Sequence, residues 1–239
     1  GKEYCGEIIV EDIGIKKTVF KKIKPMIKKN SPELWVDEYP FPKAIDHKYS
    51  RGMVLINVGP IHQTGAARLA GRSAMRVGAG AVKLVCDINT AAVLEPQISV
   101  ELISVIKNKN DFQSLLKDKK ISSVLVGPGN GISDETKART LLALAFVDNV
   151  VIDADAITSF ESNPKELFID TYHHTILTPH EGEFVRLFGE KINRIEDKVL
   201  RTLEAAKLAG SIIVLKGSDT IIASPKGEVV INSSEAPYL

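Results

Sequence analysis

The sequence has only two cysteines in 239 residues, Cys5 and Cys86, and they lie far apart. A disulfide framework requires pairs of cysteines at close spacings, and a cysteine-based metal site requires several neighbouring ones. Neither kind of site is therefore supported. So low a cysteine content suits a reducing compartment, and we expect a cytoplasmic location.

An excess of charge of one sign and long apolar runs are also absent. The chain has 31 basic and 30 acidic side chains, for a formal net charge of +1, which gives no electrostatic basis for binding nucleic acid. The longest apolar run, Leu141–Val147, is far shorter than the roughly 20 residues that span a bilayer. We therefore expect neither a nucleic-acid nor a membrane partner, which leaves small polar or phosphate-bearing ligands.

Two common nucleotide-binding motifs are missing as well. A dinucleotide fingerprint requires G-x-G-x-x-G, but counted from Gly127 the sixth position is Ile132. No G-x-x-x-x-G-K-[ST] segment occurs, which excludes a P-loop. The loop Gly127-Pro128-Gly129-Asn130-Gly131 nevertheless has few side chains, so a phosphate or a flat substrate can approach its backbone amides.

From His47 onward, short apolar runs alternate with helical patterns. The predicted strands are Met53–Val58, Val82–Ile88, Ser122–Val126, Val150–Ile152, Thr175–Leu177 and Ile212–Leu215. The predicted helices are Gly65–Val77 after the N-cap Thr64, Ser133 to about Phe146, a short helix after Pro179 that ends at Gly189, and Glu196–Ala209. This alternation predicts an α/β fold with a mostly parallel sheet covered on both faces. The runs Thr220–Ala223 and Glu228–Ile231 predict an antiparallel hairpin at its edge.

The first 44 residues have a different composition. Residues Gly6–Gly14 are typical of a strand followed by a turn, and residues 16–29 then hold seven lysines and no acid. This basic segment suits either a solvated linker or contact with an anionic surface; Pro25 interrupts its helical spacing and favours the linker. We expect an arm over residues 16–44 whose Trp35 and Phe41 pack onto the main body.

Ionisable residues and glycines follow the predicted strands. They are Gly127, Gly129, Asp153, Asp155, His180, Glu183, Lys216 and Gly217. The carboxyl ends of parallel strands meet at one edge of a sheet, where open α/β sheets bind ligands, so one shared cleft is expected.

Several of these residues have both a chemical and a plain structural interpretation. We expect Asp153 and Asp155 to lie on opposite sides of an extended backbone, so that one would face a ligand and the other would cap or brace. Glu183 with a second carboxylate could hold hydrated Mg2+ against phosphates, and Lys216 could bind phosphate. His180 and Glu183 could equally well cap the helix that follows them. The histidines His62, His173 and His174 have no ligand-like spacing and are expected at the surface or in turns.

Seven short motifs together carry a family resemblance. In order they are His47–Gly52, Thr64–Ala70, Arg76–Gly80, Gly127–Gly129, Asp153–Ala156, Thr178–Glu183 and Leu215–Gly217. With these motifs the chain resembles the NAD(P)H-hydrate dehydratase family, which has a ribokinase-like fold with three α/β/α layers. The resemblance covers about Ile45–Leu239. Residues Gly6–Gly14 are similar to the closing strand of the epimerase domain that precedes the dehydratase in bifunctional versions. The implied domains are therefore 1–15, the tail of that first domain, 16–44, the linker, and 45–239, the dehydratase domain.

The resemblance implies repair of a damaged cofactor. NADH or NADPH hydrated at C6 is phosphorylated on its hydroxyl at the expense of ADP or ATP with Mg2+, and phosphate then leaves. The implied substrate-binding residues are Ala66, Gly129, Asp153 and His180; the implied nucleotide-binding residues are Lys216, Gly217, Ser218, Asp219 and Thr220; Glu183 would organise the metal. The resemblance also implies a homo-oligomer and an N-terminal epimerase domain in the full-length chain.

The chain departs from the family in two places. The family has Gly-Gly-Ser or Gly-Gly-Pro where this chain has Asn57-Val58-Gly59-Pro60. The Gly-[Thr/Ser]-Gly-Asp motif, which carries the catalytic base, is expected beyond Leu239, so no catalytic residue is predicted within residues 1–239 and little turnover is expected from them alone. Two alternatives therefore stay open: a ribokinase-like kinase of a small alcohol such as a thiazole or pyrimidine precursor, and a catalytically incomplete nucleotide-binding domain. Small-alcohol kinases usually carry Asn at the position of His180.

Overall fold

Short runs rich in valine, isoleucine and leucine form the strands, as expected for β-branched and aliphatic side chains on a buried pleated surface. The computed structural model describes residues 5, 9–99, 101–171 and 174–232. The strands within these ranges are β1 (Ile27–Lys29), β2 (Met53–Asn57), β3 (Ala81–Cys86), β4 (Leu102–Val105), β5 (Ile121–Val126), β6 (Val150–Ile152), β7 (Thr175–Leu177), β8 (Ile212–Leu215), β9 (Thr220–Ala223) and β10 (Val229–Asn232).

All ten strands of the described chain belong to one sheet, in the order β1-β10-β9-β8-β7-β6-β5-β2-β3-β4. The strands from β8 to β4 in this order run parallel to their neighbours. Strand β9 is antiparallel to both β8 and β10, which confirms the predicted edge hairpin. The carboxyl ends of β2, β5, β6, β7 and β8 consequently lie along one edge.

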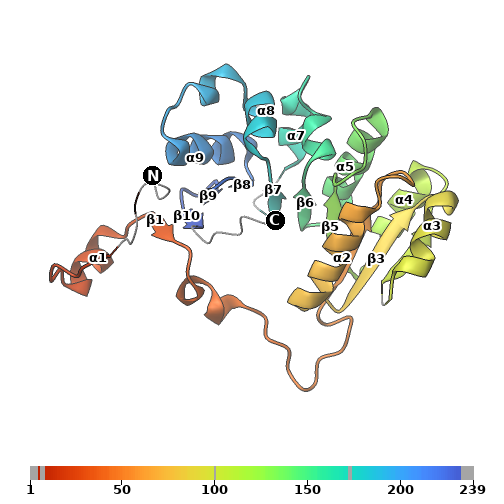
Figure 1. Cartoon of the computed structure of the whole chain (residues 1–239), viewed down its shortest axis with the longest axis horizontal. Helices are drawn as coiled ribbons and strands as arrows, with labels where there is room; N and C mark the ends of the chain where they lie inside the picture. The colour runs from red at the N-terminus through yellow and green to blue at the C-terminus, as the bar shows by residue number, and fades with distance from the viewer. Residues whose placement is uncertain (1–4, 6–8, 100, 172–173, 233–239) are drawn as a thin grey trace.

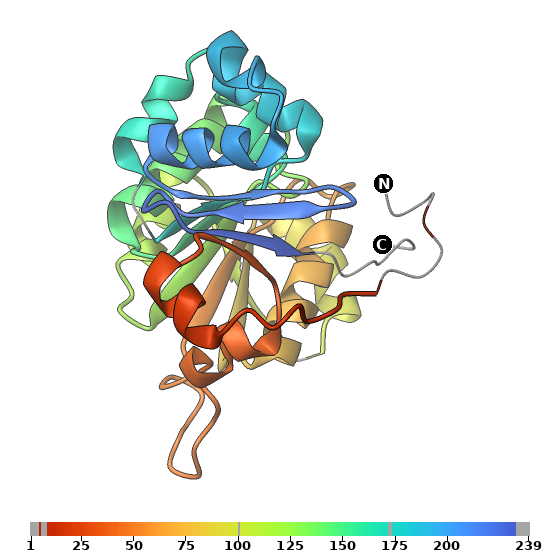
Figure 2. The same cartoon turned by 90° about the vertical axis from the view of Figure 1, so that its left-hand side faces the viewer.

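The helices are α1 (Lys17–Ile23), α2 (Gly65–Val77), α3 (Ile88–Leu94), α4 (Lys109–Leu116), α5 (Asp134–Phe146), α6 (Asp155–Thr158), α7 (Pro164–Asp170), α8 (Glu181–Asn193) and α9 (Lys198–Ala209). Helices α5, α7, α8 and α9 cover one face of the sheet and α2 packs on the other (Figures 1 and 2). No helix in the described ranges is both long and apolar enough to cross a membrane. The predicted α/β/α architecture is confirmed.

Helix starts follow the capping residues in the sequence. Ser133 accepts a hydrogen bond from the Thr136 amide and begins α5, as predicted. Thr64 precedes α2 as predicted, but its backbone is already helical and its side chain makes no capping bond, so the predicted cap is wrong. Gly189 has φ 66° and ψ 177° and kinks α8, which resumes and continues to Asn193 instead of ending there.

The predicted strand Val82–Ile88 is wrong at its end. Strand β3 stops at Cys86 because the Asp87 carboxylate accepts hydrogen bonds from the amides of Asn89 and Thr90 and so caps α3. The apolar residue Ile88 therefore opens a helix and is exposed. The helix cap made by the Asp87 side chain therefore ends the strand, although the apolar run continues to Ile88.

The N-terminal arm differs from its prediction in two respects. Residues 9–16 form no strand, and Ile9 and Val10 are exposed, because no described strand lies beside them to complete a ladder; residues 6–8 lie outside the described chain. Within the predicted linker, residues 16–44, β1 pairs in parallel with β10 at the edge of the sheet. The division of the chain into domains at residues 15 and 44 stays a prediction.

Tyr39 holds the rest of the arm to the main body, through a hydrogen bond from its hydroxyl to the Val77 carbonyl at the end of α2. The rings of Trp35 and Phe41 flank that of Tyr39 and remain largely exposed. The predicted attachment through Trp35 and Phe41 is therefore indirect.

Candidate functional site

The loops at the carboxyl edge of the sheet lie beside one another because their strands are paired. Val126 pairs with Ile152, and Ile152 with Leu177, at the ends of β5, β6 and β7. Beyond the end of β8, Lys216 forms a parallel bridge with His180, and its amide donates to the Pro179 carbonyl at 2.9 Å. Residues from four separate segments of the sequence therefore reach one edge.

Asp153 is the meeting point of three of these loops. Its Oδ1 accepts a hydrogen bond from Lys216 Nζ at 2.7 Å and a second from Thr178 Oγ1 at 2.7 Å. Both Asp153 and Lys216 are partly exposed, at 25% and 42% of the side chain. Oδ2 accepts no hydrogen bond within the part of the chain that the structure describes. The ion pair thus leaves one carboxylate oxygen available at the rim of the sheet.

Asp155 contacts a different loop from Asp153, but the predicted reason is wrong: residues two apart on an extended strand share one side, and here β6 ends at Ile152 and Asp155 is the first residue of α6. Its Oδ2 accepts a hydrogen bond from the Gly131 amide at 2.8 Å. The prediction that one of the two aspartates would act as a brace is therefore confirmed for Asp155. Between them, Ala154 has φ 47° and ψ −120°, a conformation that non-glycine residues rarely adopt and that strains the backbone at this point.

The glycine loop, residues 127–131, packs by backbone against its neighbours. Gly127 has φ 117°, and a Cβ there would lie 1.7 Å from the Asp153 carbonyl oxygen. A Cβ on Gly59 would lie 1.5 Å from the Gly129 carbonyl oxygen, and one on Gly129 would lie 2.7 Å from that of Gln63. Only glycine permits these approaches, so the loop is pressed between the turn after β2 and the turn after β6.

His180 and Glu183 form a reciprocal capping box at the start of α8. His180 Nδ1 accepts hydrogen bonds from the amides of Gly182 at 2.9 Å and Glu183 at 3.3 Å. Glu183 Oε2 accepts one from the His180 amide at 2.8 Å, and its side chain is 7% exposed. Since Nδ1 is an acceptor, the cap is made by the neutral imidazole with its proton on Nε2. The His180 side chain is 55% exposed, and its Nε2 lies 3.4 Å from Glu183 Oε1.

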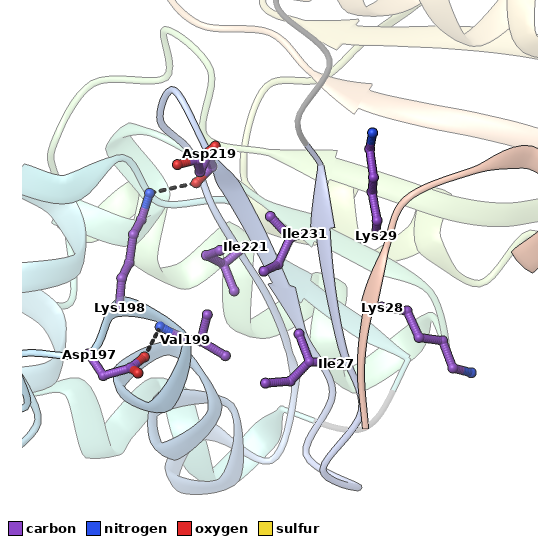
Figure 3. A pocket seen from close by; sticks show the side chains of 9 residues that line it. All are labelled: Ile27, Lys28, Lys29, Asp197, Lys198, Val199, Asp219, Ile221 and Ile231. Carbon is purple, nitrogen blue, oxygen red and sulfur yellow. Dashed lines mark hydrogen bonds between the residues drawn. The ribbon is translucent and has the colours of Figure 1, made fainter. Parts of the chain in front are cut away.

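The turn from Lys216 to Thr220 is held by the start of α9. Lys198 Nζ donates a hydrogen bond to the Asp219 carbonyl at 2.6 Å, and Thr220 Oγ1 donates one to the Gly217 carbonyl at 3.1 Å. A groove of about 700 Å3 lies below this turn, between α9 and the edge strands. Figure 3 shows the side chains of Ile27, Val199, Ile221 and Ile231 along it, with Lys198 and Asp219 at one end.

Of the predicted site residues, Asp153, His180 and Lys216 are brought together, and Glu183 lies directly behind His180. Ala66 is exposed in the first turn of α2, three residues after Gln63, whose carbonyl oxygen approaches Gly129. Gly217, Ser218 and Asp219 are exposed on the turn. Among the predicted surface histidines, His62 and His174 are exposed, and His173 lies outside the described residues.

Sequence reasoning missed three residues that shape this edge: Asn57, Thr178 and Lys198. Thr178 lay inside a motif already singled out, and a hydroxyl directly after a buried strand was a usable signal. Asn57 also had a signal, since an amide in an otherwise apolar strand requires buried partners. Lys198 had none, because its contact with Asp219 depends on how α9 packs.

A family model described as NAD(P)H-hydrate dehydratase matches residues 54–239. Two curated proteins named bifunctional NAD(P)H-hydrate repair enzyme Nnr are each 30% identical to this chain. The protein from Methanopyrus kandleri matches 81% of this chain and 38% of its own length. The protein from Dictyoglomus turgidum matches 96% of this chain and 46% of its own length. The chain thus spans less than half the length of these relatives.

Solved structures give the same picture for the fold. An ADP/ATP-dependent NAD(P)H-hydrate dehydratase from Bacillus subtilis, co-crystallised with ATP and Mg2+, is 27% identical, with a TM-score of 0.67 over 84% of this chain and 73% of its own. A ribokinase-like superfamily protein from Enterococcus faecalis, at 19% identity, has a TM-score of 0.71 over 88% of this chain and 73% of its own. This second similarity concerns the fold alone.

Proposed function

Because the chain belongs to the NAD(P)H-hydrate dehydratase family, we propose that it acts in the nucleotide-dependent dehydration of NADH or NADPH hydrated at C6. The C6 hydroxyl gives up its proton and attacks the terminal phosphorus of ADP or ATP, and AMP or ADP leaves. The resulting phosphate ester then loses phosphate and a ring proton to restore the ring double bond. Phosphorylation is needed because hydroxide is a poor leaving group, whereas phosphate leaves readily.

The observation that carries the proposal is the convergence of Asp153, His180 and Lys216 at the carboxyl ends of β6, β7 and β8. Open α/β sheets bind ligands at such an edge. A lysine there supplies the positive charge that a phosphate requires. The Nε2–H of the half-exposed His180 lies at a long distance of 3.4 Å from Glu183 Oε1, and it supplies a hydrogen-bond donor for a polar group of the nicotinamide ring.

On this proposal the substrate lies on the glycine-loop side and the nucleotide on the side of β8. Ala66, Gly129, His180 and Asp153 border the hydrated nicotinamide. The nucleotide contacts the turn formed by Lys216, Gly217, Ser218, Asp219 and Thr220. The ion pair between Asp153 and Lys216 then joins the two halves of the site, because one member belongs to each.

Magnesium fits this site only with water and phosphate as most of its ligands. The described residues include no cluster of three metal-binding side chains, and Glu183 is a single, mostly buried carboxylate. Mg2+ commonly keeps several waters and binds one or two carboxylates plus substrate phosphates. Glu183 is therefore the residue that would hold the hydrated ion, which would neutralise charge on the phosphates.

Binding measured by calorimetry tests the proposal without depending on turnover. We expect hydrated NADH and ATP to bind. We also expect the dissociation constant of hydrated NADH to be lower than that of NADH itself. His180→Asn keeps a good helix cap, because Asn is as effective an N-cap as any residue, but it changes the donor that faces the substrate. This variant should therefore weaken binding of hydrated NADH while leaving ATP binding unchanged.

Turnover is followed in parallel, as recovery of dihydronicotinamide absorbance from hydrated NADH with ADP or ATP. A chain that binds a thiazole or pyrimidine alcohol but not hydrated NADH would instead be a small-alcohol kinase. Binding of ATP alone, with neither alcohol nor hydrated NADH, would indicate a nucleotide-binding domain.

The wider setting is proposed on the same basis. The relatives are named as bifunctional enzymes, which supports a partnership with an epimerase domain. We also propose a homo-oligomer in the cytoplasm; light scattering of the purified chain tests the assembly, and a mass that matches the monomer would contradict it.

A further inference from the structure

Asn57 is an amide in an otherwise apolar strand. It ends β2 and is 2% exposed. A buried amide is costly unless its donor and acceptor both find partners, so its surroundings must be built to receive it. Its neighbours are the glycine loop and α5.

Asn57 and Asn130 are joined by two hydrogen bonds across 73 residues of sequence. Asn57 Nδ2 donates to Asn130 Oδ1 at 2.6 Å, and Asn130 Nδ2 donates to the Asn57 carbonyl at 2.9 Å. Asn130 Oδ1 also accepts a hydrogen bond from the Gly127 amide at 2.8 Å. The end of β2 is thereby connected, through one side chain, to the first residue of the glycine loop.

Arg139 determines which way the Asn57 amide faces. Its Nη1 donates to Asn57 Oδ1 at 2.9 Å, and its Nε donates to Glu135 Oε1 at 2.9 Å. A guanidinium only donates, so Oδ1 must face Arg139 and Nδ2 must face Asn130. The guanidinium also lies over the Phe112 ring, 5.8 Å from its centroid, which fixes its position further.

The glycine loop needs such a support because it has little of its own. Gly127, Gly129 and Gly131 all have positive φ and no side chain to pack. Asp155 holds the far end through the Gly131 amide. Asn130 holds the near end through Gly127, and Asn57 holds Asn130.

We propose that Asn57 is a positioning residue: acting through Asn130, it holds residues 127–131 in the shape that receives the ligand beside Gly129. Naming that ligand as the hydrated nicotinamide ring rests on the proposed function. The proposal that Asn57 holds the glycine loop does not rest on the proposed function, since it concerns the chain without a ligand. Arg139 contributes by preventing a flip of the Asn57 side-chain amide, which would exchange the positions of Oδ1 and Nδ2.

Amide hydrogen exchange of the unliganded, isotope-labelled protein, measured by NMR, tests the support directly. Asn57→Val removes both side-chain bonds, and Asn57→Asp keeps the acceptor for Arg139 while losing the donor to Asn130. In both variants we expect exchange of the Gly127 amide to accelerate about tenfold. Exchange of the Gly131 amide should stay the same because Asp155 holds it. Asn149→Ala is the matched control, since it removes an asparagine bond to the Ser122 carbonyl at the opposite end of β5.

Ligand binding then tests what the support does. The dissociation constant of hydrated NADH should rise about tenfold in Asn57→Val and Asn130→Ala, with that of ATP unchanged. If the two residues act as one unit, the double variant should bind hydrated NADH as tightly as the single variant with the larger loss of affinity.

An unchanged exchange rate at Gly127 in both Asn57 variants would overturn the proposal. So would equal acceleration at Gly127 and Gly131, because it would show general loosening. If the wild-type protein binds no hydrated NADH, the proposed function fails, and the exchange rates still decide whether Asn57 holds the loop.

Discussion

Lys216 Nζ lies 2.7 Å from Oδ1 of Asp153, although 63 residues separate the two side chains. The same oxygen accepts the hydroxyl hydrogen of Thr178. These residues follow β8, β6 and β7 respectively, so three adjacent strands meet at one carboxylate oxygen. The position of the lysine at the rim is thereby determined by a residue of a different loop.

Asp153→Asn should weaken nucleotide binding. The amide still accepts the Thr178 bond, but Lys216 loses a charge-assisted hydrogen bond and no longer has a preferred position. Because both side chains are partly exposed, water moderates the effect, and we expect the dissociation constant of ATP, measured by calorimetry, to rise roughly tenfold. Glu161→Gln is the control: it removes an exposed ion pair in which Glu161 Oε2 lies 3.3 Å from Arg186 Nε, and it should not change the dissociation constant of ATP. Equal affinities in the wild type and Asp153→Asn would contradict the role of the pair.

Glu183→Gln separates the capping role of Glu183 from its proposed role with Mg2+. Glutamine completes a capping box as glutamate does, so urea denaturation should give nearly the wild-type free energy of unfolding. Glu183→Ala should cost about 1 kcal/mol. In Glu183→Gln, Mg2+ should no longer strengthen ATP binding, whereas chelating the metal should weaken binding in the wild type. If Mg2+ strengthens ATP binding equally in both, Glu183 is a cap alone.

Gly59→Ala should destabilise the fold by about 3 kcal/mol or more, because the new Cβ would lie 1.5 Å from the Gly129 carbonyl and neither backbone can move away. Gly65→Ala is the matched control. Nothing lies within 4 Å of a Cβ at Gly65, which opens α2, so this change should stabilise by about 0.5 kcal/mol. Urea denaturation measures both. Similar free energies for the two variants would mean that the turn and the glycine loop do not pack closely.

Only one of the two cysteines should react in the folded protein. Cys5 is exposed, whereas burial and the neighbouring charge of Asp87 raise the pKa of the Cys86 thiol to about 11. At pH 8, a thiol reagent should therefore modify one equivalent, and the second only after denaturation, as counted by mass spectrometry. Rapid modification of both would contradict the burial of Cys86.

The raised pKa of the Cys86 thiol also makes the stability of the fold depend on pH. The folded pKa lies above the unfolded value of about 8.5, so the contribution of the thiol to stability is fully present below that pH and is lost as the pH rises towards 11. Cys86→Ala should remove this part of the pH dependence, which denaturation at pH 8 and pH 10 can measure.

Most of the central sheet was predictable from local patterns. The bounds of β6, β7, β8 and β9 agree with the prediction, since each is an apolar run limited by glycine, proline, or polar residues. Strand β1 was not predictable, because its three residues lie in a lysine-rich segment and are all exposed. It exists through its pairing with β10, about 200 residues later, and nothing in its own composition indicates that pairing.

The sequence alone determined most strands of the central sheet and which residues stand at its carboxyl edge, because apolar periodicity and chain-breaking residues act over a few positions. The tertiary structure decided which of those residues touch. The bonds between Asp153 and Lys216, and between Asn57 and Asn130, join distant segments. Their partners depend on the order of strands in the sheet, which is set by packing of the whole chain rather than by any single stretch of it.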